Sequence, residues 1–378
     1  MIDLHDIPSA TPCYVYDMGL LRNTIAEVKR NIEGFPYDVH YAIKANYVPI
    51  ILGEIAASGL GADLVSGPEL HAALEAGFKP TRLAFSGVGK TDDEIIAGID
   101  NGIFCFNVES FPELQNISNL AVSRGLTANV AIRVNPNINA HTHKYVTTGV
   151  AENKFGINLN LLDKIVDMAL ELPYIHLRGL HFHIGSQIMT KRPYKLLCDK
   201  VNELQDRFNA RGIEFEMINV GGGLGVDYDN PDEHAIPDFE GFFNVFKQYL
   251  NLRAGQRLHF EFGRSIVAQC GTLISRVLYI KDNGNKKFVI LDAGMTDLIR
   301  PALYQSHHII ENITSASRHI ESYDVVGPVC ESGDVFGRDE QLPITQRGDI
   351  IAIRTAGAYG ESMASCYNMR ALPRHCCI

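Results

Sequence analysis

The sequence lacks any stretch that approaches 18 consecutive apolar residues, so no helix of this chain is expected to span a bilayer. It also lacks a run of basic residues, and its formal net charge is −10. Nucleic acids and anionic membranes bind clustered positive charge. Neither is therefore an expected partner of this protein.

Cysteine pairs with metal-binding or redox spacing are absent as well. The 8 cysteines are scattered along the chain and none forms a CxxC pair, which gives little support to zinc or thioredoxin-like chemistry. We therefore predict no metal site. The N-terminal segment MIDLHDIPSATPCYVYD lacks the basic and then apolar order of a signal peptide. The simplest interpretation is a cytoplasmic protein with reduced thiols.

Short β-rich segments alternate with helical patterns from residue 20 to about 265. The helical segments, such as TDDEIIAGIDNG, carry apolar residues at three- and four-residue spacing. Eight such βα units predict an α/β fold with a (β/α)₈ barrel, and they fit an open doubly wound sheet less well. The predicted strands are DVHYAIKA (38–45), GADLVS (61–66), RLAFSG (82–87), FCFNVE (104–109), NVAIRVN (129–135), LRGLHFHIG (177–185), FEMINVGGG (215–223) and RLHFEFG (257–263).

The alternation of strand and helix patterns stops beyond Arg264. Segments such as GTLISRVLYIKD and DIIAIRTAG read as strands, and no long helical pattern separates them. A length of 378 residues allows about two domains. We predict a barrel over residues 20–268 and a C-terminal all-β domain over residues 269–378, to which residues 1–19 contribute a strand through CYVYD.

Polar residues gather at the predicted C-terminal ends of the barrel strands, where barrel enzymes place their chemistry. Each has an ordinary structural explanation: a strand histidine is usually a satisfied core residue, and a GGG can be a tight turn. Their joint placement at one rim favours a functional site instead. The residues are Lys44, Asp63, Ser66, Arg133, His181, His183, Ser186, Gly221, Gly222, Gly223, Glu261 and Arg264.

The types of residue at this rim fit pyridoxal phosphate. Lys44 follows a strand in apolar company, and a buried amine has a lowered pKa and is a better nucleophile, although a strand-end lysine more often reaches out to solvent. The glycines of GGGLG allow backbone N–H groups to approach a phosphate. They do not fit a dinucleotide-binding motif, because they follow a late strand of the barrel and do not open an N-terminal βαβ unit. Glu261 suits the pyridine nitrogen and His183 suits stacking on the ring.

The ordered motifs of the chain resemble those of the diaminopimelate decarboxylases, over nearly its whole length. This family belongs to the fold-type III pyridoxal phosphate enzymes, with the ornithine and arginine decarboxylases. The resemblance implies decarboxylation of meso-2,6-diaminopimelate to L-lysine and CO₂, the last step of lysine biosynthesis. The motifs are YAIKAN, HFHIGSQ, NVGGGLGVDY, EFGRS, LDAGMTDLIRPALY, VVGPVCESGDVF and GAYGESMASCYN.

The resemblance also implies roles for individual residues. Lys44 would form the Schiff base and Cys330 would handle a proton. Cys330 and Glu331 would come from the partner subunit of a homodimer with shared active sites. With the rim pattern, it predicts cofactor contacts at Lys44, Asp63, His183, Ser186, Gly222, Gly223, Glu261, Phe262, Gly263, Arg264 and Tyr359. The substrate, a small amino acid, would contact Arg264, Arg300, Tyr304, Glu331 and Tyr359.

Two features depart from the family pattern, and two other functions stay open. Phe262 stands where proline is commonest, and the chain stops at ALPRHCCI where many relatives continue, as either a short variant or an altered terminus. A decarboxylase of polyamine metabolism, acting on carboxynorspermidine or another basic amino acid, is the main rival. LIRPALY argues against it, since an arginine suits a distal carboxylate. The second rival is a catalytically inactive regulatory homologue.

Overall fold

The protein folds into two compact units. The computed structural model describes residues 10–138 and 154–378, so residues 1–9 of the segment inspected for a signal peptide lie outside it. Ile25–Gly225 and Asp238–Gly263 form the barrel unit, whereas residues up to Thr24, Val226–Pro237 and Arg264–Ile378 form the β unit. In the part of the chain that is described, no helix is long and apolar enough to cross a membrane.

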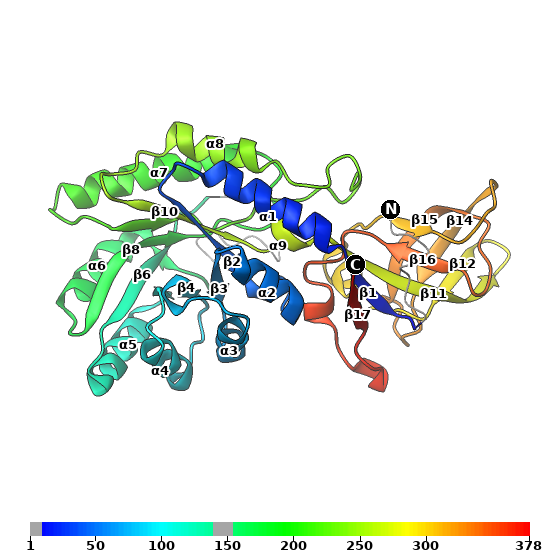
Figure 1. Ribbon diagram of the computed structural model, residues 1–378, viewed down its shortest axis with the longest axis horizontal. Helices are drawn as coiled ribbons and strands as arrows, with labels where there is room; N and C mark the ends of the chain where they lie inside the picture. Colours follow the sequence, from blue (N-terminus) through cyan, green and yellow to red (C-terminus); the bar gives the residue numbers. More distant parts are fainter. Residues whose placement is uncertain (1–9, 139–153) are drawn as a thin grey trace. The chain divides into compact units, whose positions relative to one another are not determined.

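Eight parallel strands close into a barrel in the barrel unit (Figure 1). Their order is β5-β4-β3-β2-β10-β9-β8-β6, and pairing of β5 with β6 closes the ring, while the two-residue strand β7 (Ile157–Asn158) pairs with β6. The predicted (β/α)₈ barrel is thereby confirmed. The strands are β2 (Tyr37–Ala42), β3 (Gly61–Leu64), β4 (Leu83–Phe85), β5 (Cys105–Val108), β6 (Ala128–Asn135), β8 (Ile175–Phe182), β9 (Met217–Asn219) and β10 (Arg257–Phe262).

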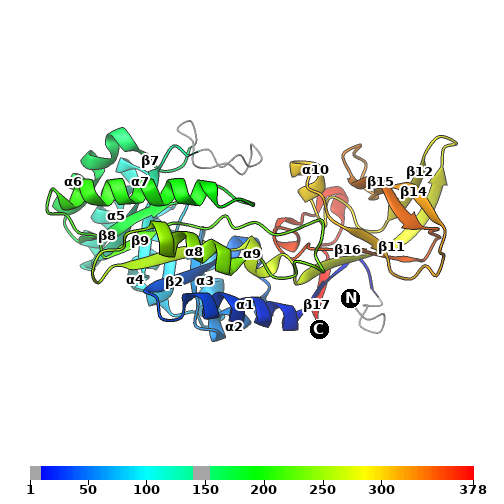
Figure 2. The ribbon, with the colours of Figure 1, turned by 90° about the horizontal axis from the view of Figure 1, so that it is seen from above.

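Helices alternate with these strands and cover the outside of the barrel, where α7 and α8 lie side by side (Figure 2). Capping fixes where several of them begin: the side chains of Ser66, Thr91 and Ser110 accept backbone N–H groups of the first turns of α3, α4 and α5. The helices are α1 (Met18–Ile32), α2 (Pro49–Ala57), α3 (Gly67–Glu75), α4 (Asp92–Asp100), α5 (Phe111–Arg124), α6 (Leu162–Glu171), α7 (Arg192–Asn209) and α8 (Phe239–Tyr249).

Strand β10 shows why the polar residues of the rim point into the barrel. Its side chains alternate, and Phe260 and Phe262 face outwards onto the aromatic side of α8, with ring centroids of Phe260 and Phe243 4.9 Å apart. The residues that alternate with them, His259 and Glu261, must then face inwards. Packing of phenylalanines outside the barrel thus places a carboxylate inside it.

The β unit is a mixed sheet. Strands follow the order β13-β16-β11-β12-β14-β15, and β1 near the N-terminus pairs with both β11 and the C-terminal β17. Two short helices, α9 (Arg264–Val267) and α10 (Arg300–Tyr304), also belong to this unit. The strands are β1 (Cys13–Tyr16), β11 (Gly271–Asp282), β12 (Lys287–Leu291), β13 (Ile310–Asn312), β14 (Ile320–Val326), β15 (Val335–Pro343), β16 (Ile350–Ile353) and β17 (Arg374–Cys377).

Candidate active site

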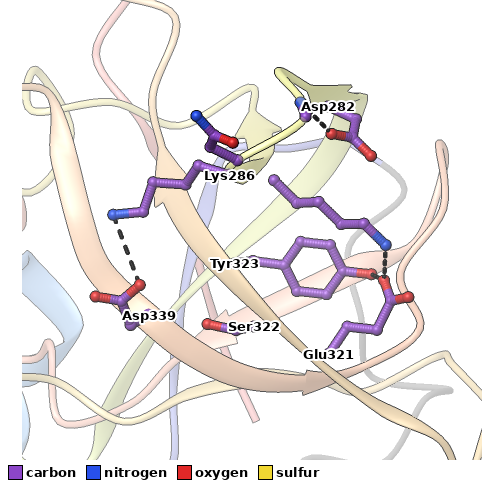
Figure 3. A pocket seen from close by; sticks show the side chains of 9 residues that line it. Asp282, Lys286, Glu321, Ser322, Tyr323 and Asp339 are labelled. Atoms are coloured by element: carbon purple, nitrogen blue, oxygen red, sulfur yellow. Dashed lines mark hydrogen bonds and ion pairs between the residues drawn. The ribbon is translucent and has the colours of Figure 1, made fainter.

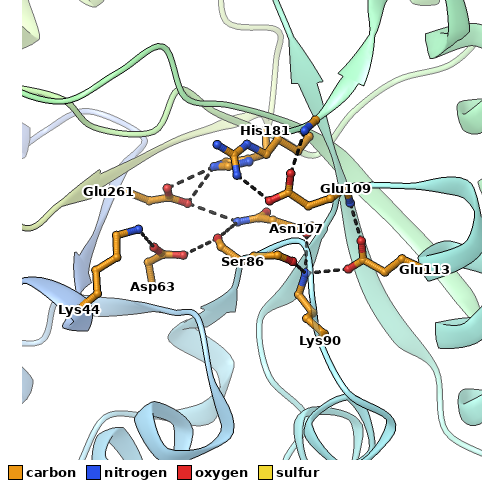
Figure 4. Close-up of polar contacts among 12 residues, drawn as sticks. Lys44, Asp63, Ser86, Lys90, Asn107, Glu109, Glu113, His181 and Glu261 are labelled. Carbon is orange, nitrogen blue, oxygen red and sulfur yellow. Dashed lines mark hydrogen bonds and ion pairs between the residues drawn. The ribbon is translucent and has the colours of Figure 1, made fainter. Parts of the chain in front are cut away.

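A connected set of polar side chains fills one layer of the barrel interior (Figure 4). Its centre is Glu261 on β10, whose carboxylate accepts hydrogen bonds from Asn219 Nδ2 at 2.8 Å and from Asn107 Nδ2 at 3.3 Å. The imidazole Nε2 of His181 lies 3.1 and 3.2 Å from the two carboxylate oxygens. Parallel strands end at one rim, so residues distant in sequence meet in this layer.

The environment of Glu261 keeps its carboxylate ionised. Burial alone raises the pKa of Glu261, but the charge and hydrogen bond of His181, with His183 and Lys44 nearby, hold that pKa well below its usual range. A permanently anionic carboxylate inside a barrel suits a ligand that carries a positively charged N–H group.

Lys44 is more exposed than the sequence predicts. Strand β2 ends at Ala42, and residues Ile43–Ala45 form a short 3₁₀ helix, η2, which buries Ile43 and Ala45 but not Lys44. The Lys44 side chain is 45% exposed, and its Nζ lies 3.7 Å from Oδ2 of the buried Asp63. The expectation of a buried amine is therefore wrong, while its place at the rim beside a carboxylate holds.

The glycines after β9 serve the packing of the barrel first. A Cβ at Gly222 would lie 1.7 Å from the carbonyl oxygen of Glu261, and Gly221 and Gly223 have φ values of 67° and 101°. The turn also adjoins a buried hydroxyl: Tyr194 Oη lies 3.2 Å from the Cβ position of Gly223. Among residues 10–138 and 154–378 this hydroxyl has no hydrogen-bond partner. This hydroxyl is thus available to donate a hydrogen bond at the turn.

His183 follows β8 on the same rim and is partly buried. Desolvation, and then the charges of Arg133 and Lys44, lower the pKa of His183 to about 3. Its imidazole is therefore neutral at physiological pH. A neutral aromatic ring can lie against another ring without the cost of a buried charge.

A second lysine, Lys90, is buried just outside this layer and has a structural role. Its Nζ donates to the carbonyl oxygens of Gly87 at 2.7 Å and Asn107 at 2.9 Å and to the carboxylate of Glu113 at 2.6 Å. All three N–H donors of an ammonium are thus occupied. The contacts join the ends of β4 and β5, and so hold Asn107 in place.

Replacement of Lys90 by methionine is expected to destabilise the protein by about 3–5 kcal/mol, because it leaves the buried carboxylate of Glu113 without a positively charged partner. Urea unfolding measures this loss. The matched control is Lys191→Met, since the Lys191–Asp238 pair is exposed on both sides, and a change of at most about 1 kcal/mol is expected there. Equal losses in the two variants would contradict the structural role of Lys90.

The predicted substrate residue Arg264 lies in the β unit, among tyrosines. Its Nη1 donates to the hydroxyl of Tyr228 at 2.7 Å, and its guanidinium lies 5.0 Å from the ring centroid of Tyr359. Tyr359 has φ 56°, a conformation that costs energy for a residue with a side chain and that is frequent at functional sites. The fold thus holds this tyrosine against the arginine.

Arg300, at the start of α10, has a related environment in the same unit. Its guanidinium lies 5.1 Å from the Tyr228 ring and 5.9 Å from the Tyr304 ring, and Nε donates to His308 Nε2 at 3.4 Å. Burial lowers the pKa of Arg300, but a guanidinium stays charged in proteins. Within residues 10–138 and 154–378, no carboxylate forms an ion pair with it, so its charge is available to an anionic ligand.

Cys330 and Glu331 occupy an exposed turn of the β unit. The hydroxyl of Tyr367 donates to Glu331 Oε1 at 2.8 Å, and the N–H of Cys330 donates to Asn368 Oδ1 at 3.3 Å. Both predicted residues of this turn are therefore held by the YN pair of the last sequence motif.

The β unit also contains a pocket of about 340 Å³ that no sequence motif predicts (Figure 3). Its charged groups have partners within the pocket: Lys287 Nζ and the Tyr323 hydroxyl each donate to Glu321 at 2.7 Å, Lys286 lies 3.6 Å from Asp339, and Asp282 accepts the Gly284 N–H at 2.7 Å. Because each of these charged groups already has a partner, we assign no ligand to this pocket.

The structure adds three polar residues to the candidate site that the sequence analysis did not select, and it gives structural roles to the side chains of two that the analysis did select. Ser86, Asn107 and Asn219 end barrel strands, so the strand-end rule that selected Asp63 also applies to them. Ser66 follows β3, and its side chain caps α3 by accepting the Glu69 N–H. The side chain of Phe262 packs on α8, which leaves only its backbone for a cofactor.

Comparison with known families supports a cofactor in the barrel. Residues 19–268 match the family described as "Pyridoxal-dependent decarboxylase, pyridoxal binding domain". The residues present fit pyridoxal phosphate: an anionic Glu261 for the pyridine N–H, a neutral His183 for the ring, Lys44 for the aldehyde, and the Tyr194 hydroxyl beside the glycine turn for the phosphate. Pyridoxal phosphate is thus the cofactor of this chain.

Full-length relatives narrow the family. Diaminopimelate decarboxylase of Bacteroides thetaiotaomicron is 55% identical over 96% of this chain and 94% of its own length. The structure of diaminopimelate decarboxylase from Helicobacter pylori complexed with L-lysine has a TM-score of 0.91 and 41% identity, covering 98% of this chain and 92% of that chain. The enzyme from M. jannaschii in co-complex with L-lysine has a TM-score of 0.88 and 38% identity, covering 97% and 87%. The chain therefore belongs to the diaminopimelate decarboxylases, within the pyridoxal-dependent decarboxylase family.

Proposed function

We propose that the protein removes one carboxylate of meso-2,6-diaminopimelate as CO₂ and releases L-lysine, the last step of lysine biosynthesis. The observation that carries this proposal is Arg300, a buried arginine that has tyrosines and a histidine as neighbours and no acidic partner among the described residues. Relatives of up to 55% identity named for this activity support it.

Arg300 binds the end of the substrate that does not react. The planar guanidinium binds a carboxylate through two parallel hydrogen bonds, and the amino-carboxylate at the far end of diaminopimelate supplies one. His308 Nδ1 lies 2.9 Å from the carbonyl oxygen of Arg354, and burial lowers the pKa of His308 to about 3, so its Nε2 is an acceptor for Arg300 Nε. This hydrogen bond orients the guanidinium of Arg300, and Tyr304 limits the space beside that guanidinium.

The barrel unit supplies the chemistry through the bound cofactor, which acts as an electron sink for the pair left when a carbon–carbon bond breaks. Glu261 accepts the pyridine N–H and stabilises the positive charge of the ring. Lys44 holds the aldehyde carbon, His183 covers the ring, and the backbone of the glycine turn with Ser186 holds the phosphate. Arg264 follows Gly263 directly in the chain and, with Tyr359, holds the cofactor and the substrate.

The exposed turn of the β unit supplies the proton that replaces the lost carboxylate. Cys330 is the group that handles this proton, and Glu331 binds the distal amino group of the substrate. We propose that both act on the neighbouring chain of a homodimer, because an exposed turn is free to contact a second copy and a two-fold axis repeats each contact.

Two other functions are less well supported. A decarboxylase of polyamine metabolism, acting on carboxynorspermidine or another basic amino acid, needs an acidic residue to bind a distal amine, whereas Arg300 would repel it. An inactive regulatory homologue would have no reason to retain Lys44, an anionic Glu261 and Cys330 together. Release of CO₂ from meso-diaminopimelate, measured beside ornithine, arginine, lysine and carboxynorspermidine, separates these functions.

Mixing of two inactive variants tests the shared site. Lys44→Ala and Cys330→Ala homodimers are each expected to be nearly inactive. After dissociation and random reassociation, half of the dimers are mixed, and each mixed dimer has one site with both residues intact. Activity should therefore return to about a quarter of that of the wild type. If mass measurement confirms exchange of subunits and no activity returns, Cys330 acts within its own chain.

A further inference from the structure

Two buried carboxylates, Asp63 and Glu261, share one layer of the barrel and behave differently (Figure 4). Two like charges in a low dielectric repel, so the surroundings decide which of them keeps its charge. Glu261 has three hydrogen-bond donors around it, whereas Asp63 has the Ser86 hydroxyl and the distant Lys44. Asp63 is therefore the carboxylate that more readily takes a proton.

The carboxamide of Asn107 stands between these two acids in one orientation. Its Oδ1 lies 3.8 Å from the thiol of Cys105, which donates to it. Its Nδ2 donates to Ser86 Oγ at 2.9 Å and to Glu261 Oε1 at 3.3 Å. A carboxamide nitrogen has two hydrogens, and both are used by these two bonds.

This orientation fixes the proton of the Ser86 hydroxyl. Because Ser86 Oγ accepts from Asn107, its own hydrogen goes to Asp63 Oδ1, 2.5 Å away. Asp63 Oδ1 is thus occupied as an acceptor. The oxygen left to carry a proton is Oδ2, which is the one that faces Lys44 Nζ at 3.7 Å.

We propose that Ser86 and Asn107 are positioning residues: they leave Asp63 Oδ2 as the oxygen that can take a proton from Lys44, and the hydrogen bond that they hold on Oδ1 limits how readily it does so. In this step the N–H bond of the Lys44 ammonium breaks, its electron pair stays on nitrogen, and the proton moves to Oδ2. A neutral amine and a neutral acid replace an ammonium and a carboxylate, so the net charge is unchanged. The neutral amine is the form that reacts with an aldehyde. This inference rests on the role of Lys44 given under the proposed function.

The other charged groups around Asp63 agree with this exchange. Burial, and then the charge of Glu261, raise the pKa of Asp63, while Lys44 and the Ser86 hydrogen bond oppose that rise and His181 opposes it less. Glu69 of α3 faces the same two groups, and burial raises the pKa of Glu69 to about 7. Asp63 thus holds its charge weakly, and the Ser86 hydrogen bond is one of the few contacts that keep it ionised.

The test follows the rate at which the full chain, freed of cofactor, attaches pyridoxal phosphate to Lys44 as a function of pH. Replacement of Ser86 by alanine removes a hydrogen bond that favours the Asp63 carboxylate, so the proton moves from Lys44 to Asp63. The midpoint of the rate profile is expected to shift down by about one pH unit. A merely structural role would lower the fraction of protein that reacts and leave the midpoint in place.

Three further variants make the test specific. Ser86→Thr keeps the hydroxyl and should retain the wild-type midpoint. In an Asp63→Asn background, Ser86→Ala should cause no additional shift, because the acid that it acts on is gone. If Ser86→Ala does not fold, Ser86→Cys replaces it, since a thiol is a weak donor and should shift the midpoint in the same direction.

The outcomes separate this inference from the proposed function. An unchanged midpoint in folded Ser86→Ala, or an equal shift in the Asp63→Asn background, overturns the positioning role alone. Attachment of the cofactor at a residue other than Lys44 overturns the proposed function as well.

Discussion

Replacement of Lys44 by alanine is expected to abolish covalent attachment of pyridoxal phosphate and to lower turnover by more than about a thousandfold. Lys44 is the amine at the rim beside Asp63, in the layer that holds Glu261. Loss of a covalent nucleophile removes a step for which neighbouring groups give no substitute. The fold should remain, because the Lys44 side chain is 45% exposed and η2 buries its neighbours instead. Borohydride reduction followed by peptide mass mapping measures attachment.

The control for this variant is Lys200→Ala, which removes an amine from an exposed pair on α7. It should leave both attachment and turnover unchanged. If Lys44→Ala protein still binds the cofactor covalently, or if mapping of the wild type finds the reduced cofactor on another lysine, the assignment of Lys44 is wrong.

Selectivity for diaminopimelate over ornithine and lysine should be at least about a hundredfold in kcat/KM. Those two amino acids end in an ammonium group and leave the buried charge of Arg300 without its carboxylate. An unpaired buried charge costs about 3–5 kcal/mol. Since each 1.4 kcal/mol corresponds to about tenfold, the lower value already gives that factor. Carbon dioxide release at matched substrate concentrations provides the measurement.

Variants of Arg300 localise this selectivity. Arg300→Ala should lower kcat/KM for diaminopimelate and raise kcat/KM for ornithine, because the charge that ornithine leaves unpaired is gone. Arg300→Lys keeps the charge and loses the planar fork, so it should recover only part of the loss. The exposed Arg338, whose guanidinium pairs with Asp324, offers a control in Arg338→Ala, with no change expected. Comparable efficiency on ornithine, or full diaminopimelate turnover in Arg300→Ala, would refute this interpretation.

Local pattern alone was sufficient for the barrel. Strand-length apolar segments separated by helical periodicity predicted eight parallel strands, and all eight form. The period of two along β10 determines that Glu261 faces inwards when Phe260 and Phe262 pack on α8. Placement of Lys44, Asp63, His183 and the glycine turn at one rim follows from strand ends, because parallel strands finish on the same side.

The tertiary structure decided how the side chains at that rim pair. Two lysines that follow β-rich segments look alike in sequence, yet Lys90 is buried with all its donors occupied, whereas Lys44 is 45% exposed and lies near Asp63. That difference depends on where the chain leaves each strand: the 3₁₀ turn after β2 was not visible in a segment that reads as one continuous strand.

The direction of the Asn107–Ser86–Asp63 chain likewise required three strands to be placed together. Hydrogen bonds between side chains of different strands depend on distances of a few tenths of an ångström, which sequence spacing does not encode. The same holds for Arg300, whose lack of an acidic partner among the described residues is a property of its surroundings. The sequence determined which groups reach the rim, since that follows from local periodicity. Only the packing of distant segments decided that Glu261 keeps its charge and that Arg300 has no acidic partner among the described residues, because desolvation and pairing depend on neighbours in space.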